Sequence, residues 1–246
     1  MKHRITSEDI ACLVPALNSI LDGAYLTQIY DGMKDSTKII IMKLRNRIED
    51  KNITYYLLIE SGIRIHTIES FTSIRQFPSG FIGKLRKEIG DKRLYPLQQI
   101  GTDRSIDFLF SNEKHFIIEF YDRGNYILTD KDFKIIYIAR PYKFQETKLD
   151  VGIIYPKDEI AKNGIPLTKD ISQAKGYLID KQNFSGFPLE GKSVLELDNI
   201  NLAMQKYFTY EVKEPKKNIN KKKKEINKDE KRKMNIENQI NKLDKN

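Results

Sequence analysis

The chain contains a single cysteine, Cys12, among 246 residues. An internal disulfide is therefore excluded, and a lone thiol fits a reducing compartment. Three histidines, at positions 3, 66 and 115, are too scattered to indicate a metal site. No apolar run has membrane-spanning length, and no signal-like segment follows the first residues. We expect a cytoplasmic protein with no metal, no cofactor and no membrane partner.

Positive charge is in moderate excess, with 43 Lys and Arg against 34 Asp and Glu, a net charge of +9. The excess is uneven. Residues 211–246 hold 13 basic and 7 acidic residues, which gives +6, so the remaining 210 residues carry only +3. A balance of this kind suits a polyanionic partner such as ribosomal or transfer RNA but does not demand one.

Three parts are expected from composition: a globular domain over residues 1–145, a polar connector over 146–194 and a basic helix over 195–246. The first part alternates apolar runs with turns. Thr6 and Asp9 have the spacing of a helix capping box, and Pro15 should shorten or kink the helix that follows. A second helix is expected over 79–90. Strands are expected at 25–30, 38–44, 55–60, 63–68, 94–100, 105–110, 116–121, 126–129 and 133–139.

Many short strands with two helices predict an α+β domain built as an antiparallel β-sandwich or a flattened barrel with flanking helices. The tail beyond residue 195 has a poor heptad pattern that improves toward its end. The pattern is therefore equally consistent with the start of a coiled coil and with a solvent-exposed basic helix.

Three short motifs carry a family resemblance: residues 77–87 (FPSGFIGKLRK), 101–108 (GTDRSIDF) and 119–125 (EFYDRGN). Their order over roughly residues 1–145 resembles the N-terminal domain of the nuclear export mediator factor family, called NFACT. That family includes subunits of the eukaryotic ribosome quality control complex and bacterial fibronectin-binding relatives. The resemblance implies a fold like the N-terminal lobe of formamidopyrimidine-type DNA glycosylases.

Glycosylase chemistry is not expected here. Those enzymes use an N-terminal proline amine with an adjacent glutamate, whereas this chain has Lys2 and His3 at those positions. Their zinc finger needs clustered cysteines, and Cys12 stands alone. Fold likeness does not carry activity with it, so we expect no enzyme.

The resemblance implies a transfer RNA-binding and tailing site at Asp9, Asp103 and Arg104. An arginine fork suits phosphate or guanine edges, and a neighbouring carboxylate can orient it. Taken from the residues alone, Asp9 caps a helix and Asp103 with Arg104 forms an exposed turn salt bridge of under about 1 kcal/mol. An RNA-binding basic patch is assigned to Arg64, Lys84, Arg86, Lys87 and Arg123. A cluster of basic residues such as the one at 84–87 is, however, more commonly the solvent-exposed face of a helix.

The family role would make this chain a non-catalytic ribosome-associated quality control factor. It would bind the obstructed large ribosomal subunit and its transfer RNA, and act with the ubiquitin ligase of the quality control complex. It would also support template-free addition of residues to the C-terminus of the stalled chain (CAT tailing). The alternative is a generic ribosome- or RNA-binding module without tailing. A surface adhesin is a third class, and the absence of a signal or anchor counts against it.

Overall fold

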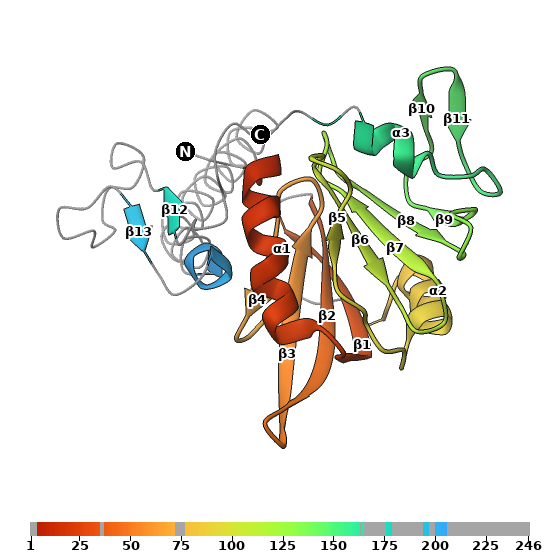
Figure 1. Ribbon diagram of the computed structural model, residues 1–246. Coiled ribbons are helices and arrows are strands. Elements are labelled where there is room, and N and C mark those ends of the chain that lie inside the picture. The colour runs from red at the N-terminus through yellow and green to blue at the C-terminus, as the bar shows by residue number, and fades with distance from the viewer. Residues whose placement is uncertain are drawn as a thin grey trace, which may run out of the picture. The chain divides into compact units, whose positions relative to one another are not determined.

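A computed structural model describes residues 4–34, 37–71, 77–162, 164, 176–178, 194–196 and 200–205. The described chain is α+β, and its strands form antiparallel sheets that do not close into a barrel (Figure 1). This confirms the expected class and excludes the flattened barrel. The likeness to a glycosylase lobe stays a prediction. Almost all of the expected C-terminal helix falls outside the described residues.

Helix α1 spans Ser7–Leu21 and begins with the predicted capping box. The Thr6 hydroxyl accepts from the Asp9 amide at 3.2 Å, and the Thr6 amide donates to the Asp9 carboxylate at 2.8 Å. The apolar face of the helix is buried. Pro15 does not end the helix, which continues for six more residues, so the expected shortening is wrong. The capping box fixes where α1 starts.

The first sheet is a four-stranded meander in the order β1-β2-β3-β4. β2 and β3 are longer than expected because their hairpin extends to a tight turn in which Glu49 and Asp50 both take positive φ, the geometry of a primed two-residue turn. The bounds are β1 Tyr25–Lys34, β2 Thr37–Ile48, β3 Lys51–Glu60 and β4 Arg64–Ile68.

The second sheet has five short strands in the order β5-β6-β7-β8-β9. Only two residues of the expected strand at 94–100 pair as a strand of this sheet. Apolar residues dominate β7 and β8, where every residue is buried. The bounds are β5 Gln98–Gln99, β6 Ser105–Leu109, β7 His115–Glu119, β8 Asn125–Thr129 and β9 Ile135–Ile138.

Residues 91–95 join the two sheets at one end. On one side, the Leu94 amide donates to the Ala24 carbonyl at 2.8 Å, beside the start of β1. On the other, the Tyr95 amide donates to the Leu109 carbonyl at 2.9 Å, at the end of β6. This extended segment therefore serves both sheets, although it belongs to neither over most of its length.

Two turns join the sheets at the other end. The Ser61 hydroxyl in the β3–β4 turn donates to the Arg123 carbonyl in the β7–β8 turn at 2.6 Å, and Arg140 donates to the same carbonyl at 2.6 Å. Gly124 takes a φ of +69°, and a Cβ there would lie 2.7 Å from the Ser61 backbone. The two turns touch through backbone, which leaves no room for a side chain.

Helix α2, Gly80–Ile89, starts at an N-cap serine, Ser79. It packs between the sheets. Phe81 stacks on Tyr137 with ring centroids 4.7 Å apart, and Arg86 donates from Nε to the Ile29 carbonyl at 2.9 Å. Figure 1 shows α1 and α2 well apart, with strands between them. Phe81 near the start of α2 thus contacts the second sheet, and Arg86 near its end contacts the first.

The packed core does not end at residue 145, where we expected the domain boundary. Leu149, Tyr155 and Ile160 are at most 5% exposed and share a cluster with Ile117 and Ile127 of the second sheet. Leu149 ends β11, Tyr155 lies between β11 and α3, and Ile160 lies within α3. The bounds are β10 Tyr142–Phe144, β11 Thr147–Leu149 and α3 Lys157–Lys162.

A later helical segment, residues 200–205, also packs on the domain. Asn201 is buried, accepts from the Thr67 amide at 2.9 Å and donates to the Thr67 hydroxyl at 2.7 Å, so its side chain pairs with edge strand β4. Before it, β12 Gly176–Leu178 pairs with β13 Val194–Glu196. The expected division at 145 and 195 therefore separates residues that pack together.

Replacing Gly124 by alanine should destabilise the domain by at least about 2 kcal/mol, because an L residue is strained at positive φ and its Cβ meets backbone. Gly83→Ala is the matched control. Gly83 lies within α2 with open space where a Cβ would go, so alanine there should stabilise by about 0.5–1 kcal/mol. Urea unfolding of both variants measures this. Equal effects of the two changes would contradict the turn-to-turn contact.

Asn201→Ala should cost about 1–3 kcal/mol, because it leaves the buried amide and hydroxyl of Thr67 without their partner. Leu202→Ala, at a neighbouring position that is 38% exposed, should cost clearly less. Thermal melting of the two variants compares them. A smaller loss for Asn201→Ala than for Leu202→Ala would show that residues 200–205 are not anchored through this pair.

Candidate functional site

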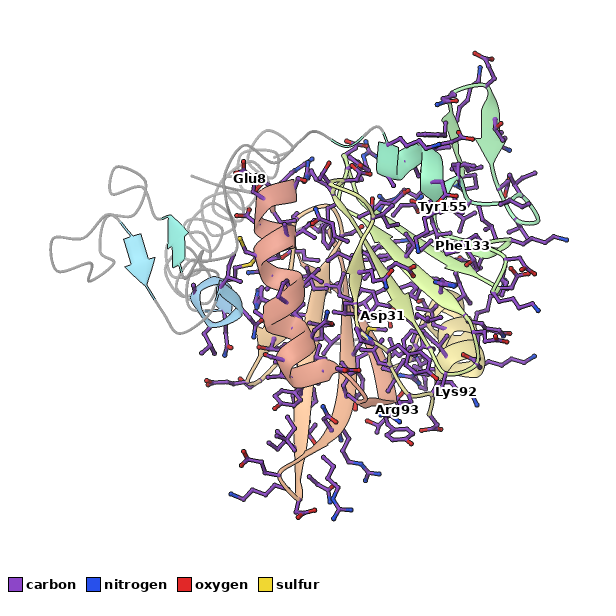
Figure 2. All side chains as sticks on the ribbon, viewed as in Figure 1. Glu8, Asp31, Lys92, Arg93, Phe133 and Tyr155 are labelled. Carbon is purple, nitrogen blue, oxygen red and sulfur yellow. The ribbon has the colours of Figure 1, made fainter. Side chains whose placement is uncertain are left out.

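A hollow of about 480 Å³ lies where the start of α1, the β5–β6 turn, the end of β7 and the hairpin β10–β11 come together. Figure 2 shows Glu8 and Tyr155 at this end of the molecule. The lining combines a charged pair with aromatic rings: Ser7, Thr102, Asp103, Arg104, Glu119, Tyr121, Tyr142, Phe144 and Ile160. A volume of this size accommodates a ligand of nucleoside dimensions.

The β5–β6 turn is held rigidly. The Asp103 amide donates to the Ile100 carbonyl at 3.0 Å, and the Gln99 side-chain amide donates to the Asp103 carbonyl at 2.8 Å and to the Ser7 carbonyl at 3.1 Å. Gly101 takes a φ of +56°, and a Cβ there would lie 2.7 Å from the Ala161 backbone. The turn is thereby fastened to α1 and packed against α3.

Arg104 reaches into this hollow as a partly unsatisfied donor. Its Nε and Nη2 atoms are buried, and among the residues that the structure describes neither atom has a hydrogen-bond partner. Burial lowers the pKa of Arg104, the nearby charge of Arg4 lowers it further, and Asp103 and Asp9 act in the opposite direction. Buried donors are normally paired, so this guanidinium is prepared to receive an acceptor from outside the chain.

Asp103 is half-buried beside Arg104. Burial raises the pKa of Asp103, whereas the Arg104 amide, the Ser105 hydroxyl at 3.1 Å and the Arg104 charge lower it. The sequence predicted that this pair is exposed, whereas both residues are of intermediate exposure. Both side chains are partly enclosed.

A buried carboxyl group forms the base of the site. Glu119, at the end of β7, is 3% exposed. The hydroxyls of Tyr142 and Tyr155 both donate to its Oε1, at 2.7 and 2.9 Å. Burial raises the pKa of Glu119, opposed by these two hydrogen bonds and by Asn125. Burial also raises the pKa of each tyrosine, and the Glu119 charge adds to this. Glu119 is therefore a fixed polar group in the lining of the same hollow as Arg104.

The structure brings together three of the residues that the sequence singled out. Asp9 and Asp103 both act electrostatically on Arg104. Asp9 also closes the capping box, so its structural role is confirmed, and a role in binding transfer RNA stays a prediction. Arg123 lies on the adjoining β7–β8 turn, where its exposed side chain is available and its carbonyl joins the sheets.

Arg64 requires a correction. Its side chain is buried and donates from Nε to the Glu60 carboxylate at 2.7 Å. The predicted patch requires Arg64 to be exposed, but four consecutive residues of β4, 64–67, are buried. A buried, paired guanidinium does not belong to an exposed RNA-binding patch.

The other predicted basic residues lie on α2, away from the hollow. Arg86 is occupied by the Ile29 carbonyl. Lys84 lies over the Tyr137 ring, with Nζ 4.8 Å from the centroid, and Lys87 is exposed. The predicted patch is thus three separate groups of residues, and RNA binding by Lys84, Lys87 and Arg123 stays a prediction.

Sequence reasoning missed Glu119, Tyr142 and Tyr155. Glu119 lies in the motif at 119–125, but nothing in the sequence shows that a strand-end carboxylate turns inward. The two tyrosines are 23 and 36 residues further along the chain, at and beyond the expected domain end. No pattern in the sequence links either tyrosine to Glu119.

Among the described residues, no group of three or more His, Cys, Asp or Glu is arranged to hold a metal ion. Within the same residues, no helix has both the length and the apolar character needed to cross a membrane.

Comparison with solved structures identifies the fold. The N-terminal part of the fibronectin/fibrinogen-binding protein of Streptococcus suis matches with a TM-score of 0.51 and 21% identity, over 61% of this chain and 59% of that one. The N-terminal domain of the fibronectin-binding protein PavA of Streptococcus pneumoniae matches with a TM-score of 0.51 and 18% identity, over 83% and 80%. The class is therefore that of the N-terminal domains of these bacterial proteins.

Residues 7–159 match the family model described as NFACT N-terminal and middle domains. The chain belongs to the NFACT family. Among similar curated proteins are the ribosome quality control complex subunit NEMF of Mus musculus, 38% identical over 163 residues, and subunit 2 of Saccharomyces cerevisiae, 35% identical over 157. These matches cover 64% and 63% of this chain but only 15% and 14% of those proteins.

Glu119→Gln should alter how stability depends on pH. The raised pKa means that the folded protein keeps this proton to a higher pH than the unfolded chain does. Stability of the natural chain therefore falls as pH rises through the interval between the two pKa values, by about 1.4 kcal/mol per unit of pKa difference. In the variant, the glutamine oxygen can still accept from both tyrosines. Because glutamine does not titrate, this position adds no dependence of stability on pH.

Denaturant unfolding at pH 4 and pH 7 measures this difference. Relative to Glu119→Gln, the natural chain should lose stability between the two pH values. A relative gain over the same range would mean that the hydrogen bonds to the carboxylate outweigh burial.

Proposed function

We propose that this chain acts in ribosome quality control, as a non-catalytic cytoplasmic factor that binds transfer RNA on the obstructed large ribosomal subunit. The single observation that carries the RNA-binding part is the Arg104 guanidinium, whose buried donors lack partners at an aromatic-lined hollow. The names of the related eukaryotic proteins support the cellular role.

The chemistry of the hollow favours an unpaired nucleotide as its ligand. Arg104 offers a planar fork suited to phosphate oxygens or the acceptor edge of guanine. Tyr121 is 42% exposed, and with Phe144 it provides ring faces on which a base can stack. Asp103 can accept from base amino groups. Single-stranded regions of RNA present all these features at once, whereas a duplex hides its bases.

The chain would contribute recognition only. Peptide-bond formation in tailing would stay with the ribosome, and the ubiquitin ligase of the quality control complex would be a partner of the assembled factor. The alternative is a generic RNA-binding module without tailing. In that case the same hollow would bind RNA with little preference among transfer RNAs. Comparing affinities for several transfer RNAs separates the two.

Arg104→Lys tests the arginine fork while keeping the charge. Transfer RNA affinity, measured by fluorescence anisotropy on the full chain, should fall about 5- to 150-fold, the equivalent of about 1–3 kcal/mol for one bidentate contact. Lys131→Gln, which removes an exposed charge between β8 and β9, should change affinity much less.

The melting temperature of Arg104→Lys should stay close to that of the natural chain, because the buried donors make no hydrogen bond that the change would remove. Unchanged affinity together with a drop of several degrees would assign Arg104 a structural role and refute the proposed site.

A further inference from the structure

A second concentration of arginines lies at the opposite end of α1 from the Arg104 hollow. In the β1–β2 register Tyr25 stands directly opposite Arg45, and on its other side Tyr25 forms a bridge with Arg93. Directly paired residues on neighbouring strands project from the same face of a sheet. Arg93, Tyr25 and Arg45 therefore form one row across three adjacent strands. Figure 2 shows Arg93 beyond the end of α1, far from Glu8.

This row lines a groove of about 410 Å³, in which Arg47 and Asn52 form a second row one step along the hairpin. The Tyr25 ring is 50% exposed, although a large aromatic side chain is normally covered when it has somewhere to pack. Tyr25 instead lies open with an arginine on each side.

The groove is built on fixed backbone. Arg93 exchanges hydrogen bonds with Ser111, whose amide donates to the Arg93 carbonyl at 2.8 Å and whose hydroxyl accepts from the Arg93 amide at 3.2 Å. The guanidinium rests close to Gly23, where a Cβ would lie 3.0 Å from Nη2. Asn46 ties β2 to α1 by donating to the Ile20 and Asp22 carbonyls at 2.9 and 3.0 Å.

Positive charge in the groove is only partly compensated. Arg47 pairs with Asp50 at 2.9 Å on an exposed turn, and Asp22 contributes a carboxylate to the lining. Among the described residues, however, neither Arg45 nor Arg93 has a carboxylate within ion-pair distance. Two exposed guanidinium groups therefore flank an exposed ring without an acidic partner.

We propose that this groove binds single-stranded RNA, with Arg93 and Arg45 on phosphates and a base stacked on Tyr25. Arginine forks match phosphate oxygens, and a ring face between two cations suits a base joined to two phosphates. A lipid headgroup or a phosphorylated peptide would use the arginines and leave the ring without a role.

This site goes beyond the proposed function, because it neither includes nor requires the Arg104 hollow. Helix α1 has 15 residues, so its two ends are about 22 Å apart at 1.5 Å per residue. One nucleotide cannot occupy both sites. A folded RNA, or two separate strands, can.

The test uses a fluorescein-labelled eight-nucleotide oligouridylate and the full chain, with affinity read by anisotropy at several salt concentrations. The double variant Arg45→Gln with Arg93→Gln should bind at least tenfold more weakly. The slope of log affinity against log salt should become shallower by about 1.4, at about 0.7 per lost phosphate contact. Tyr25→Ala should weaken binding at least fivefold, and Tyr25→Phe should leave it unchanged.

Lys131→Gln with Lys134→Gln is the matched control, since it removes two exposed charges from the second sheet outside both sites. It should keep affinity within twofold. The basic tail adds the same background to every variant. An equal loss in this control, or full affinity in Tyr25→Ala, would reduce the groove to general attraction of polyanions and overturn the proposal.

An alternative role for Arg93 is to balance the negative end of the α1 dipole. A lower melting temperature for Arg93→Gln with unchanged RNA affinity would establish that role and overturn the proposal. The two sites are tested separately in the Arg104→Lys background. There the groove should still bind the oligouridylate, whether or not the hollow binds transfer RNA.

Discussion

The whole arrangement depends on backbone hydrogen bonding by residues 91–95. Two open sheets with no shared strand have to be held in register, and this segment does so by pairing with the start of β1 on one side and the end of β6 on the other. At the far end the β3–β4 and β7–β8 turns meet through the hydrogen bond from the Ser61 hydroxyl to the Arg123 carbonyl and through close backbone contact at Gly124. With both ends fixed, each sheet loses freedom to slide against the other, and the residues beside each joint become fixed in position.

Both candidate sites lie beside these joints. The Arg104 hollow adjoins the turn-to-turn contact, since Arg104 accepts at its carbonyl from the Phe120 amide just before that turn. Burying Glu119 and leaving two Arg104 donors unpaired opposes stability. A fold keeps such groups where a ligand supplies what the chain lacks. The hydrogen-bonded contact between the two turns offsets this loss of stability, because it fixes the surrounding backbone without any contribution from the Glu119 and Arg104 side chains.

Local patterns predicted the elements well and the site incompletely. Alternating apolar residues identified most strands, and the spacing of Thr6 and Asp9 identified the start of α1. The motif around Asp103 predicted a turn. The sequence could not show that Arg64 folds inward onto Glu60, because a period-two pattern assigns a face without saying whether that face is covered. Tyr155 joins Glu119 across 36 residues, a distance at which periodicity carries no information and only tertiary packing decides.

The arginines show why net charge is a poor guide to binding in this domain. Arg64 is paired with Glu60, Arg86 is held by the Ile29 carbonyl and Arg140 by turn carbonyls, so these three guanidinium groups are occupied within the fold. Arg104 is enclosed but partly unpaired, and Arg45 and Arg93 are exposed. A formal charge counts all of them equally, whereas a ligand meets only those whose donors are not already engaged. The two anion-binding sites that we propose therefore depend on a few positions at the two ends of α1, and of these the sequence distinguished Arg104 but not Arg45 or Arg93.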